Sequence, residues 1–224
     1  MIIKELEILT SKLEEQTTFY TKTLDLDIVD QTNNSTSFKI GHSILKLKQS
    51  EKFTPYHYAI NIPSNQENEA LAWLKERVDV LLYDNHEIQY FDFWNAYAIY
   101  FYDKDNNIVE LIARRSLEHH STESFSRKSL LEICEIGLPT DNIRRDFDIL
   151  HEETNIPLHS GNVERFCAAG GEHGLFIMIN KEVKKEWFPT QDEPFSSDFR
   201  IVFIEGGKEY VFDYVDERLI LIPK

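Results

Sequence analysis

Residues 2–24 read IIKELEILTSKLEEQTTFYTKTL, and this stretch decides how the chain begins to fold. Apolar and polar residues alternate loosely over residues 2–10, which is typical of a β-strand with one buried face. Ser11 then opens a helical stretch, whose apolar residues are Leu13, Phe19, Tyr20 and Leu24. The first structural unit is therefore expected to begin with a strand and continue with a helix.

Three short strands are expected to follow this helix, over residues 27–30, 37–40 and 44–49. The same order, a strand, a helix and further strands, then repeats. Its second copy is predicted as a strand over 56–62, a helix capped by Asn65, and strands over 80–83, 88–93, 97–102 and 108–113. An internal repeat of this period is the most informative feature of the sequence.

A polar segment, residues 115–126, contains little that is apolar and predicts a linker. After it, residues 132–154 (EICEIGLPTDNIRRDFDILHEET) predict a strand, a cap at Asp141 and a helix. They can be laid without gaps over residues 4–26, which places Phe147 opposite Phe19. Strands near 164–168 and 174–179 complete this third unit.

The last stretch, residues 199–224, predicts three strands joined by turns at Gly206-Gly207 and Asp216-Glu217. It has no room for a helix, and we interpret it as a fourth unit that has lost one. The predicted domains are residues 1–114 and a degenerate second domain of residues 127–224.

The chain carries a large negative net charge. It has 24 Lys and Arg residues against 39 Asp and Glu residues, which gives a formal charge of −15. This charge disfavours binding to nucleic acid or to anionic membranes. Cys134 and Cys167 fit no cysteine motif and are expected to be reduced core thiols. The first residues lack the apolar stretch of a signal peptide, so a cytoplasmic location is expected.

Several segments carry a family resemblance. EILTSKLEEQTTFYTKTLDL (residues 7–26), HYAINIP (57–63) and WNAYAIYFYDKDNNIVELIAR (94–114) resemble the vicinal oxygen chelate superfamily, also called the glyoxalase/bleomycin-resistance/dioxygenase group. The resemblance implies an α+β fold of repeated βαβββ modules that form two glyoxalase-like domains with curled mixed sheets. It also implies a cup with a divalent metal ion at its floor.

The metal ligands of this superfamily fall on the first strand of a module and on the strand that closes it. At these positions the chain has Glu5, His57 and Glu110. One imidazole and two carboxylates would suit Mn, Fe(II), Ni or Zn and leave open positions, at which a substrate can bind through two neighbouring oxygens.

The residues themselves give partial support to this set. Glu110 lies in a strand that is apolar on both faces, so its carboxylate needs a metal ion, a partner such as Arg114 or Arg115, or a raised pKa. His57 shares its face with the small Ala59, although a single histidine on a strand is usually a hydrogen-bonded filler. Glu5, beside Lys4, also fits a solvated glutamate.

Tyr97 is the candidate pocket residue of the aromatic segment before Glu110. It sits where many relatives have a histidine, and we expect it to act as hydrogen-bond donor or acid/base. The second half offers no equal site, because the positions that correspond to Glu5 and His57 are occupied by Ile133 or Cys134 in the gapless overlay. Residues 128–224 are therefore expected to be structural, covering the first sheet or providing a homodimer contact.

The expected function is that of a metal-dependent lyase, isomerase or dioxygenase that acts on a small oxygen-rich organic substrate. The alternative from another class is a metal-free protein that binds and sequesters a small molecule, as bleomycin-resistance relatives do. The sequence contains no GxSxG, GxxxxGK, GxGxxG or HExxH motif, so the corresponding hydrolase, nucleotide-binding and zinc-protease interpretations have no support.

Overall fold

The computed structural model describes residues 1–223, and four successive units build its fold. In the first unit, β1 covers the predicted residues 2–10, and the helix that follows ends in a π-helical turn over Phe19–Thr23. The elements of this unit are β1 (Ile2–Thr10), α1 (Leu13–Thr18), β2 (Ile28–Gln31), β3 (Ser35–Ile40) and β4 (Ser43–Gln49).

The second unit repeats this order with one additional short strand. Its elements are β5 (His57–Asn61), α2 (Glu67–Lys75), β6 (Val80–Leu81), β7 (Gln89–Phe91), β8 (Ala96–Tyr102) and β9 (Ile108–Arg114). Asn65 does not cap α2, because its side chain instead exchanges hydrogen bonds with the backbone of Ser121. The polar segment after β9 is thereby held against the loop that precedes α2.

The third unit has the complete βαβββ order, and the fourth has only strands, as predicted. Asn142, rather than Asp141, caps the third helix, since its side-chain oxygen accepts from the backbone N–H of Arg145. The elements are β10 (Glu132–Thr140), α3 (Ile143–Thr154), β11 (Leu158–Asn162), β12 (Phe166–Gly171), β13 (Gly174–Asn180), β14 (Phe199–Glu205), β15 (Lys208–Val215) and β16 (Arg218–Leu221).

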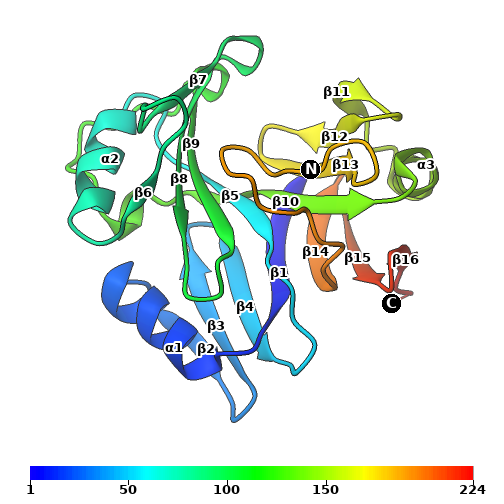
Figure 1. The fold of residues 1–224 in the computed structure, drawn as a ribbon, viewed down its shortest axis with the longest axis horizontal. Helices are drawn as coiled ribbons and strands as arrows, with labels where there is room; N and C mark the ends of the chain where they lie inside the picture. The colour runs from blue at the N-terminus through cyan, green and yellow to red at the C-terminus, as the bar shows by residue number, and fades with distance from the viewer. Residues whose placement is uncertain (224) are drawn as a thin grey trace.

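Two sheets combine these units in pairs (Figure 1). The first sheet has the order β16-β15-β14-β1-β4-β3-β2 and joins the first unit to the fourth. The second sheet has the order β11-β12-β13-β10-β5-β9-β8-β6 and joins the second unit to the third. Both sheets therefore contain strands from before and after residues 115–126. In both, the two units meet through antiparallel first strands, β1 with β14 and β5 with β10.

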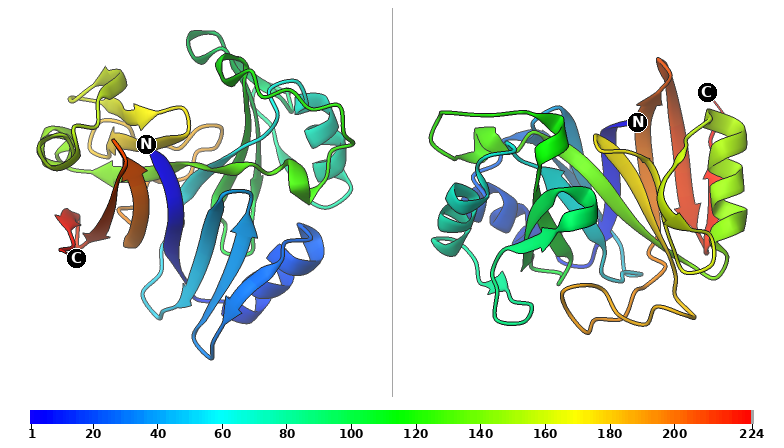
Figure 2. Two further views of the ribbon diagram at one scale, coloured as in Figure 1. Left: turned by 180° about the vertical axis from the view of Figure 1, so that it is seen from behind. Right: turned by 90° about the horizontal axis from the view of Figure 1, so that it is seen from above.

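The main hydrophobic core lies between the two sheets, where β10 crosses β1 and contacts it (Figures 1 and 2). Leu6 and Ile8 of β1 and Ile136 and Leu138 of β10 are fully buried there. A second, smaller hydrophobic cluster covers the other face of the second sheet. The candidate site lies on this outer face of the second sheet, and the main hydrophobic core packs against the opposite face.

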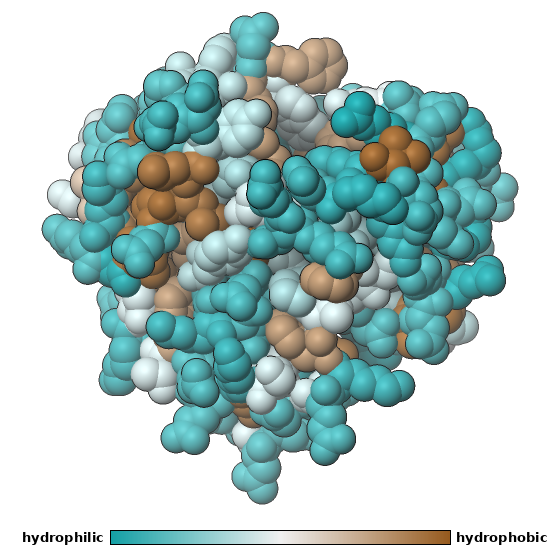
Figure 3. Space-filling view, in the orientation of Figure 1, coloured by the Kyte–Doolittle hydropathy of each residue, from teal (hydrophilic) through white to brown (hydrophobic). Residues whose placement is uncertain are grey.

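The alternating strands and the connecting loops leave a mainly hydrophilic surface on the face shown in Figure 3. A hydrophobic patch appears on this face near α2 and β6, and Leu82 and Tyr83, which follow β6, are among the exposed large hydrophobic residues. Cys134 and Cys167 are buried free thiols. None of the helices within residues 1–223 has the length and apolarity needed to cross a membrane.

Candidate metal centre

His57 is the central residue of the candidate site. It begins β5, is 6% exposed, and lies next to Ile108 in the parallel pairing of β5 with β9. Its Nδ1 is 3.2 Å from the carbonyl oxygen of Ile108. A carbonyl oxygen can only accept a hydrogen bond, so Nδ1 carries the proton. The Nε2 lone pair is therefore free to bind an electrophile.

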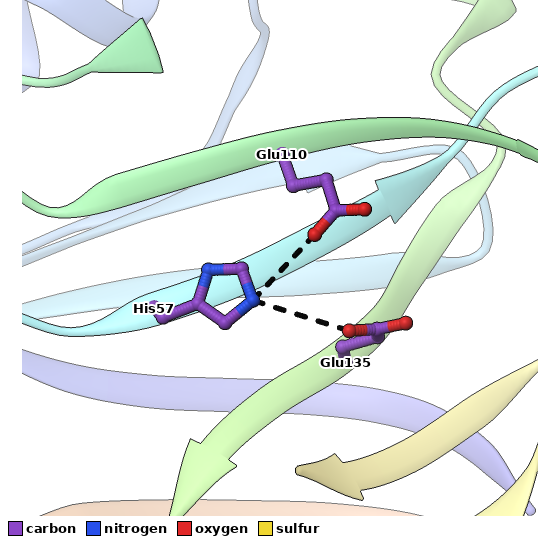
Figure 4. Close-up of side chains that lie close together, drawn as sticks. All are labelled: His57, Glu110 and Glu135. Atoms are coloured by element: carbon purple, nitrogen blue, oxygen red, sulfur yellow. Dashed lines mark ion pairs between the residues drawn. The ribbon is translucent and has the colours of Figure 1, made fainter. Parts of the chain in front are cut away.

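Two carboxylates face this Nε2 atom (Figure 4). Glu110 Oε2 lies 3.5 Å from it and Glu135 Oε2 lies 4.0 Å from it. Glu110 is on β9 and Glu135 is on β10, the two strands that flank β5 in the second sheet. One ligand atom from each of the three residues lies within 4.8 Å of the others, and all three side chains are buried.

Burial changes the pKa values of the groups in this cluster. Desolvation lowers the pKa of His57 to about 4, so the imidazole is neutral at pH 7 and forms no ion pair with the carboxylates. Burial, and then the negative charge of Glu135, raise the pKa of the Glu110 carboxyl. A neutral imidazole lone pair and two carboxyl groups converge here, and a divalent metal ion suits this donor set because it stabilises the ionised carboxylates.

Arg114 provides partial charge compensation. It is 1% exposed, and its Nη2 donates to Oε1 of Glu135, the oxygen that does not face His57. Its Nε and Nη1 have no hydrogen-bond partner, and its Cζ lies 5.1 Å from the centroid of the Trp94 ring. One guanidinium offsets one of the two carboxylate charges, so a further positive charge is needed to balance the site.

Tyr100 adds a proton donor to the cluster. It lies directly opposite Glu110 in the pairing of β8 with β9, and its hydroxyl donates a hydrogen bond to that carboxylate. Burial, together with the charges of Glu110 and Glu135, raises the pKa of Tyr100 well above its usual value. The phenol therefore stays protonated and holds its proton at the carboxylate.

A cavity of about 150 Å³ opens next to the cluster, and its walls are mainly aromatic. The ring of Trp187 lies against the imidazole of His57 in a tilted arrangement, with 4.9 Å between ring centroids. Gly137 makes this approach possible, because a Cβ at that position would lie 2.8 Å from the Trp187 ring. The lining residues are His57, Phe91, Trp94, Tyr100, Glu110, Ile112, Glu135, Phe166, Ile177, Lys184, Trp187 and Phe188.

The structure brings His57 and Glu110 together, but it does not bring Glu5 to them. Glu5 lies on β1 in the first sheet, where it pairs with Ile44 of β4 and Val202 of β14. The second unit forms its sheet with the third unit and not with the first, so the third ligand position falls to the third unit. Glu135 occupies it, and residues 128–224 thus contribute directly to the site.

A displacement of two residues explains why the sequence did not indicate Glu135. The helices α1 and α3 begin at Leu13 and Ile143, and each strand before them ends in a buried threonine, Thr10 or Thr140. Aligning these threonines places Glu135, not Ile133, opposite Glu5. Each strand also has a register shift directly before its glutamate. The threonine followed by two polar residues and a helix was the signal that could have corrected the overlay.

Tyr97 does not lie in the candidate site. It is on the opposite face of β8 from Tyr100 and is partly buried against the main core, where its ring contacts Tyr90 and the guanidinium of Arg115. The alternation of β8 was predicted correctly, but the row on the outer face is that of Ala98, Tyr100 and Tyr102, of which Tyr100 lines the cavity. The expected partners of Glu110 also differ, since Arg114 pairs with Glu135 and Arg115 pairs with Glu67.

Comparisons with known proteins agree on the fold. No protein-family model and no curated protein sequence matches the chain. Among solved structures, a putative dioxygenase from Bacillus subtilis aligns with a TM-score of 0.60 at 13% identity, over 80% of this chain and 63% of that protein's length. A lactoylglutathione lyase from Agrobacterium tumefaciens aligns with a TM-score of 0.42 at 17% identity, over 49% of this chain and 90% of that one.

A third similar structure is a glyoxalase/bleomycin resistance protein/dioxygenase from Nocardioides, with a TM-score of 0.43 and 20% identity over 51% of this chain and 83% of that one. Sequence identities of 13–20% support a shared fold and not a shared activity. The alignment with the Bacillus subtilis protein, together with the repeated βαβββ units in two sheets, confirms the expected α+β architecture. The chain therefore has the expected fold of repeated βαβββ units, which it shares with the putative dioxygenase from Bacillus subtilis.

Proposed function

We propose that His57, Glu110 and Glu135 bind a divalent metal ion of the Mn, Fe(II), Ni or Zn group. We further propose that the protein is an enzyme that acts on a small oxygen-rich molecule at this ion. The observation that supports this most strongly is the convergence of three buried donor atoms within 4.8 Å of one another, beside an open cavity.

The charge of these side chains and the number of their donor atoms suit such an ion. Two carboxylates cancel the charge of a divalent cation, and a single imidazole nitrogen with oxygen ligands suits the metals named above. Three protein ligands leave coordination positions open on the side of the cavity. When bound there, the metal ion would polarise two neighbouring oxygens of a substrate.

The surrounding residues would keep the ligands in place. The Ile108 carbonyl fixes the tautomer of His57, and Arg114 holds one oxygen of Glu135 so that the other points towards the imidazole. Such contacts orient metal ligands and maintain their basicity. The aromatic walls of the cavity lower the local polarity around the site, which strengthens the electrostatic interactions inside it.

Tyr100 and Glu110 favour a reaction that moves a proton. The Tyr100 phenol is a proton donor at the Glu110 carboxyl, and burial raises the pKa of that carboxyl, which makes it a better proton acceptor. Among the reactions expected from the resemblance, isomerisation and lyase chemistry require this transfer. Tyr100 therefore takes the role that the sequence suggested for Tyr97.

Metal analysis of the purified protein tests the proposal. After loading with Mn(II), Fe(II), Ni(II) or Zn(II) and desalting, mass spectrometry should find about one equivalent per chain in the wild type. It should find much less in Glu110→Gln. A wild-type protein that retains none of these metals would contradict the proposal and would favour the metal-free binding protein.

A further inference from the structure

Lys184 is a cation of the cavity that the proposed metal chemistry does not use. It belongs to the segment between β13 and β14 and lines the cavity together with the metal ligands. Its Nζ lies 5.3 Å from the centroid of the Trp187 ring and 5.8 Å from that of Phe166. The Phe166 distance places the ammonium over a second aromatic face.

No acidic partner compensates Lys184 within residues 1–223. The neighbouring lysines of the same segment do have partners, since Lys181 pairs with Glu217 and Lys185 pairs with Glu182. The charge that acts on Lys184 is that of Arg165, which is also positive. An unpaired ammonium beside two aromatic rings is unusual in a chain with 39 acidic and 24 basic residues.

The electrostatics of the site would favour an anionic ligand once a metal ion is bound. Arg114 offsets one of the two carboxylates, so the cluster is left with one net negative charge. A divalent ion reverses this to one net positive charge, and Lys184 adds another. Burial, and then the positive charge of Arg165, lower the pKa of Lys184. Within residues 1–223, no negative charge therefore compensates the desolvation of this ammonium.

The cavity limits the size and the shape of the ligand. Its volume of about 150 Å³ is comparable to that of an apolar cavity that accommodates benzene. Aromatic walls stack well on a flat ring, and six of the lining residues are aromatic: Phe91, Trp94, Tyr100, Phe166, Trp187 and Phe188.

We propose that Lys184 is the substrate-binding residue for an anionic group, and that the substrate class is a single-ring aromatic acid. Its carboxylate binds the Lys184 ammonium, and its ring packs between the aromatic walls. This inference rests on the proposed metal site, and it adds the charge and the size of the molecule that this site accepts.

Two probes that differ only in the carboxylate test this inference. Catechol and 3,4-dihydroxybenzoate share the ring and the two neighbouring oxygens, and their dissociation constants with Mn(II)-loaded protein can be measured by calorimetry. We expect the wild type to bind 3,4-dihydroxybenzoate about 10- to 100-fold more tightly than catechol, as is typical of a hydrogen bond to a charged group. In Lys184→Gln this preference should fall to about one.

Matched variants separate charge from folding. Lys184→Arg should keep the preference, and so should Lys185→Gln, which removes an exposed lysine with its own partner. Mn(II) affinity should be the same in all of these proteins. A wild type without the preference, a preference unchanged in Lys184→Gln, or absence of binding by both probes would each overturn the inference.

A metal-independent measurement distinguishes failure of this inference from failure of the metal site. If the wild type does not bind Mn(II), the proposed function fails, and Lys184 is then tested with benzoate and benzyl alcohol on the metal-free protein. Tighter binding of benzoate that is lost in Lys184→Gln supports the role of Lys184. Equal binding of the two molecules, or no binding, overturns it.

Discussion

The two sheets place a glutamate at equivalent positions, and the surroundings of the two glutamates differ. Glu5 on β1 and Glu135 on β10 each follow a register shift in the first strand of a unit. In the first sheet, cations from the neighbouring strands face the acidic row. Lys46 forms an ion pair with Glu7 at 2.8 Å. The negative charge of Glu5 attracts both Lys46 and Arg200.

In the second sheet, the flanking strands face Glu135 with His57 and Glu110 instead of lysines. Arg114, on the same face of β9 as Glu110, binds the far oxygen of Glu135. The same position in the fold thus gives a half-exposed, ion-paired surface in one sheet and a buried cluster with excess negative charge in the other. A candidate metal centre is therefore defined by which side chains the flanking strands provide, and not by the glutamate alone.

The largest stability difference between the sheets is expected for their arginines. Arg114→Met leaves the buried Glu135 uncompensated, so the free energy of unfolding of the metal-free protein should fall by about 3–5 kcal/mol. Arg200→Met breaks a half-exposed pair with Asp213 and should cost less than about 1 kcal/mol. Urea unfolding measures both. Equal losses would show that the two acidic rows do not differ in the way described.

His57 should dominate metal affinity. His57→Asn removes the single nitrogen donor, and the affinity for Zn(II) should fall more than about 100-fold, since even loss of a residue that only orients a ligand typically costs 10- to 100-fold. His119→Asn, in the exposed polar segment after β9, is the control and should bind the metal as the wild type does. Competition titration with a chromophoric chelator gives both constants, and similar affinities would argue against ligation by His57.

Two tyrosines on opposite faces of β8, Tyr100 and Tyr97, should also differ in how much each contributes to stability. Tyr100→Phe removes a hydrogen bond to the buried Glu110 carboxylate, which should lower the free energy of unfolding by about 1.5–3 kcal/mol. Tyr97→Phe removes a hydrogen bond with the partly exposed Arg115 and leaves the ring beside Tyr90, so it should change the free energy of unfolding by less than about 1 kcal/mol. If the Tyr97 variant is the more destabilised one in chemical denaturation, the assignment of the cavity face is wrong.

The smallest effect is a gain in stability. Glu110→Gln removes one of two buried, mutually repelling carboxylates, so the metal-free protein should become more stable by about 1 kcal/mol at pH 8. Because folding raises the pKa of Glu110, the stability of the metal-free wild type should fall as pH rises through that raised pKa, and the variant should lack this loss. In the first sheet, Glu7→Gln breaks the pair with Lys46 and should lower stability instead.

Much of the fold was predictable because local patterns determine it. Alternation gave β1 with its observed bounds, the glycine and acidic turns gave the β14–β16 meander, and the repeat gave four units, the last without a helix. Helix caps were less accurate. Asn65 does not cap α2, because its side chain binds the backbone of Ser121. Asp141 does not cap α3, because the next residue, Asn142, is the N-cap.

The site was predictable only in part. His57 and Glu110 lie on neighbouring strands of one unit, so alternation and the repeat sufficed to place them on one face. Glu135 depends on which units share a sheet, and this is a long-range choice that local patterns do not contain. A shift of two residues keeps the alternation of a strand intact, so the overlay error that hid Glu135 left no contradiction in the sequence.

The most direct test of the account compares the two equivalent glutamates. Glu135→Gln and Glu5→Gln make the same chemical change at matched positions, and Mn(II) affinity can be measured for each by electron paramagnetic resonance of the free ion. The account predicts that Glu135→Gln weakens Mn(II) binding at least about 10-fold, while Glu5→Gln binds as the wild type does. Loss of binding in Glu5→Gln, with Glu135→Gln unaffected, would contradict it.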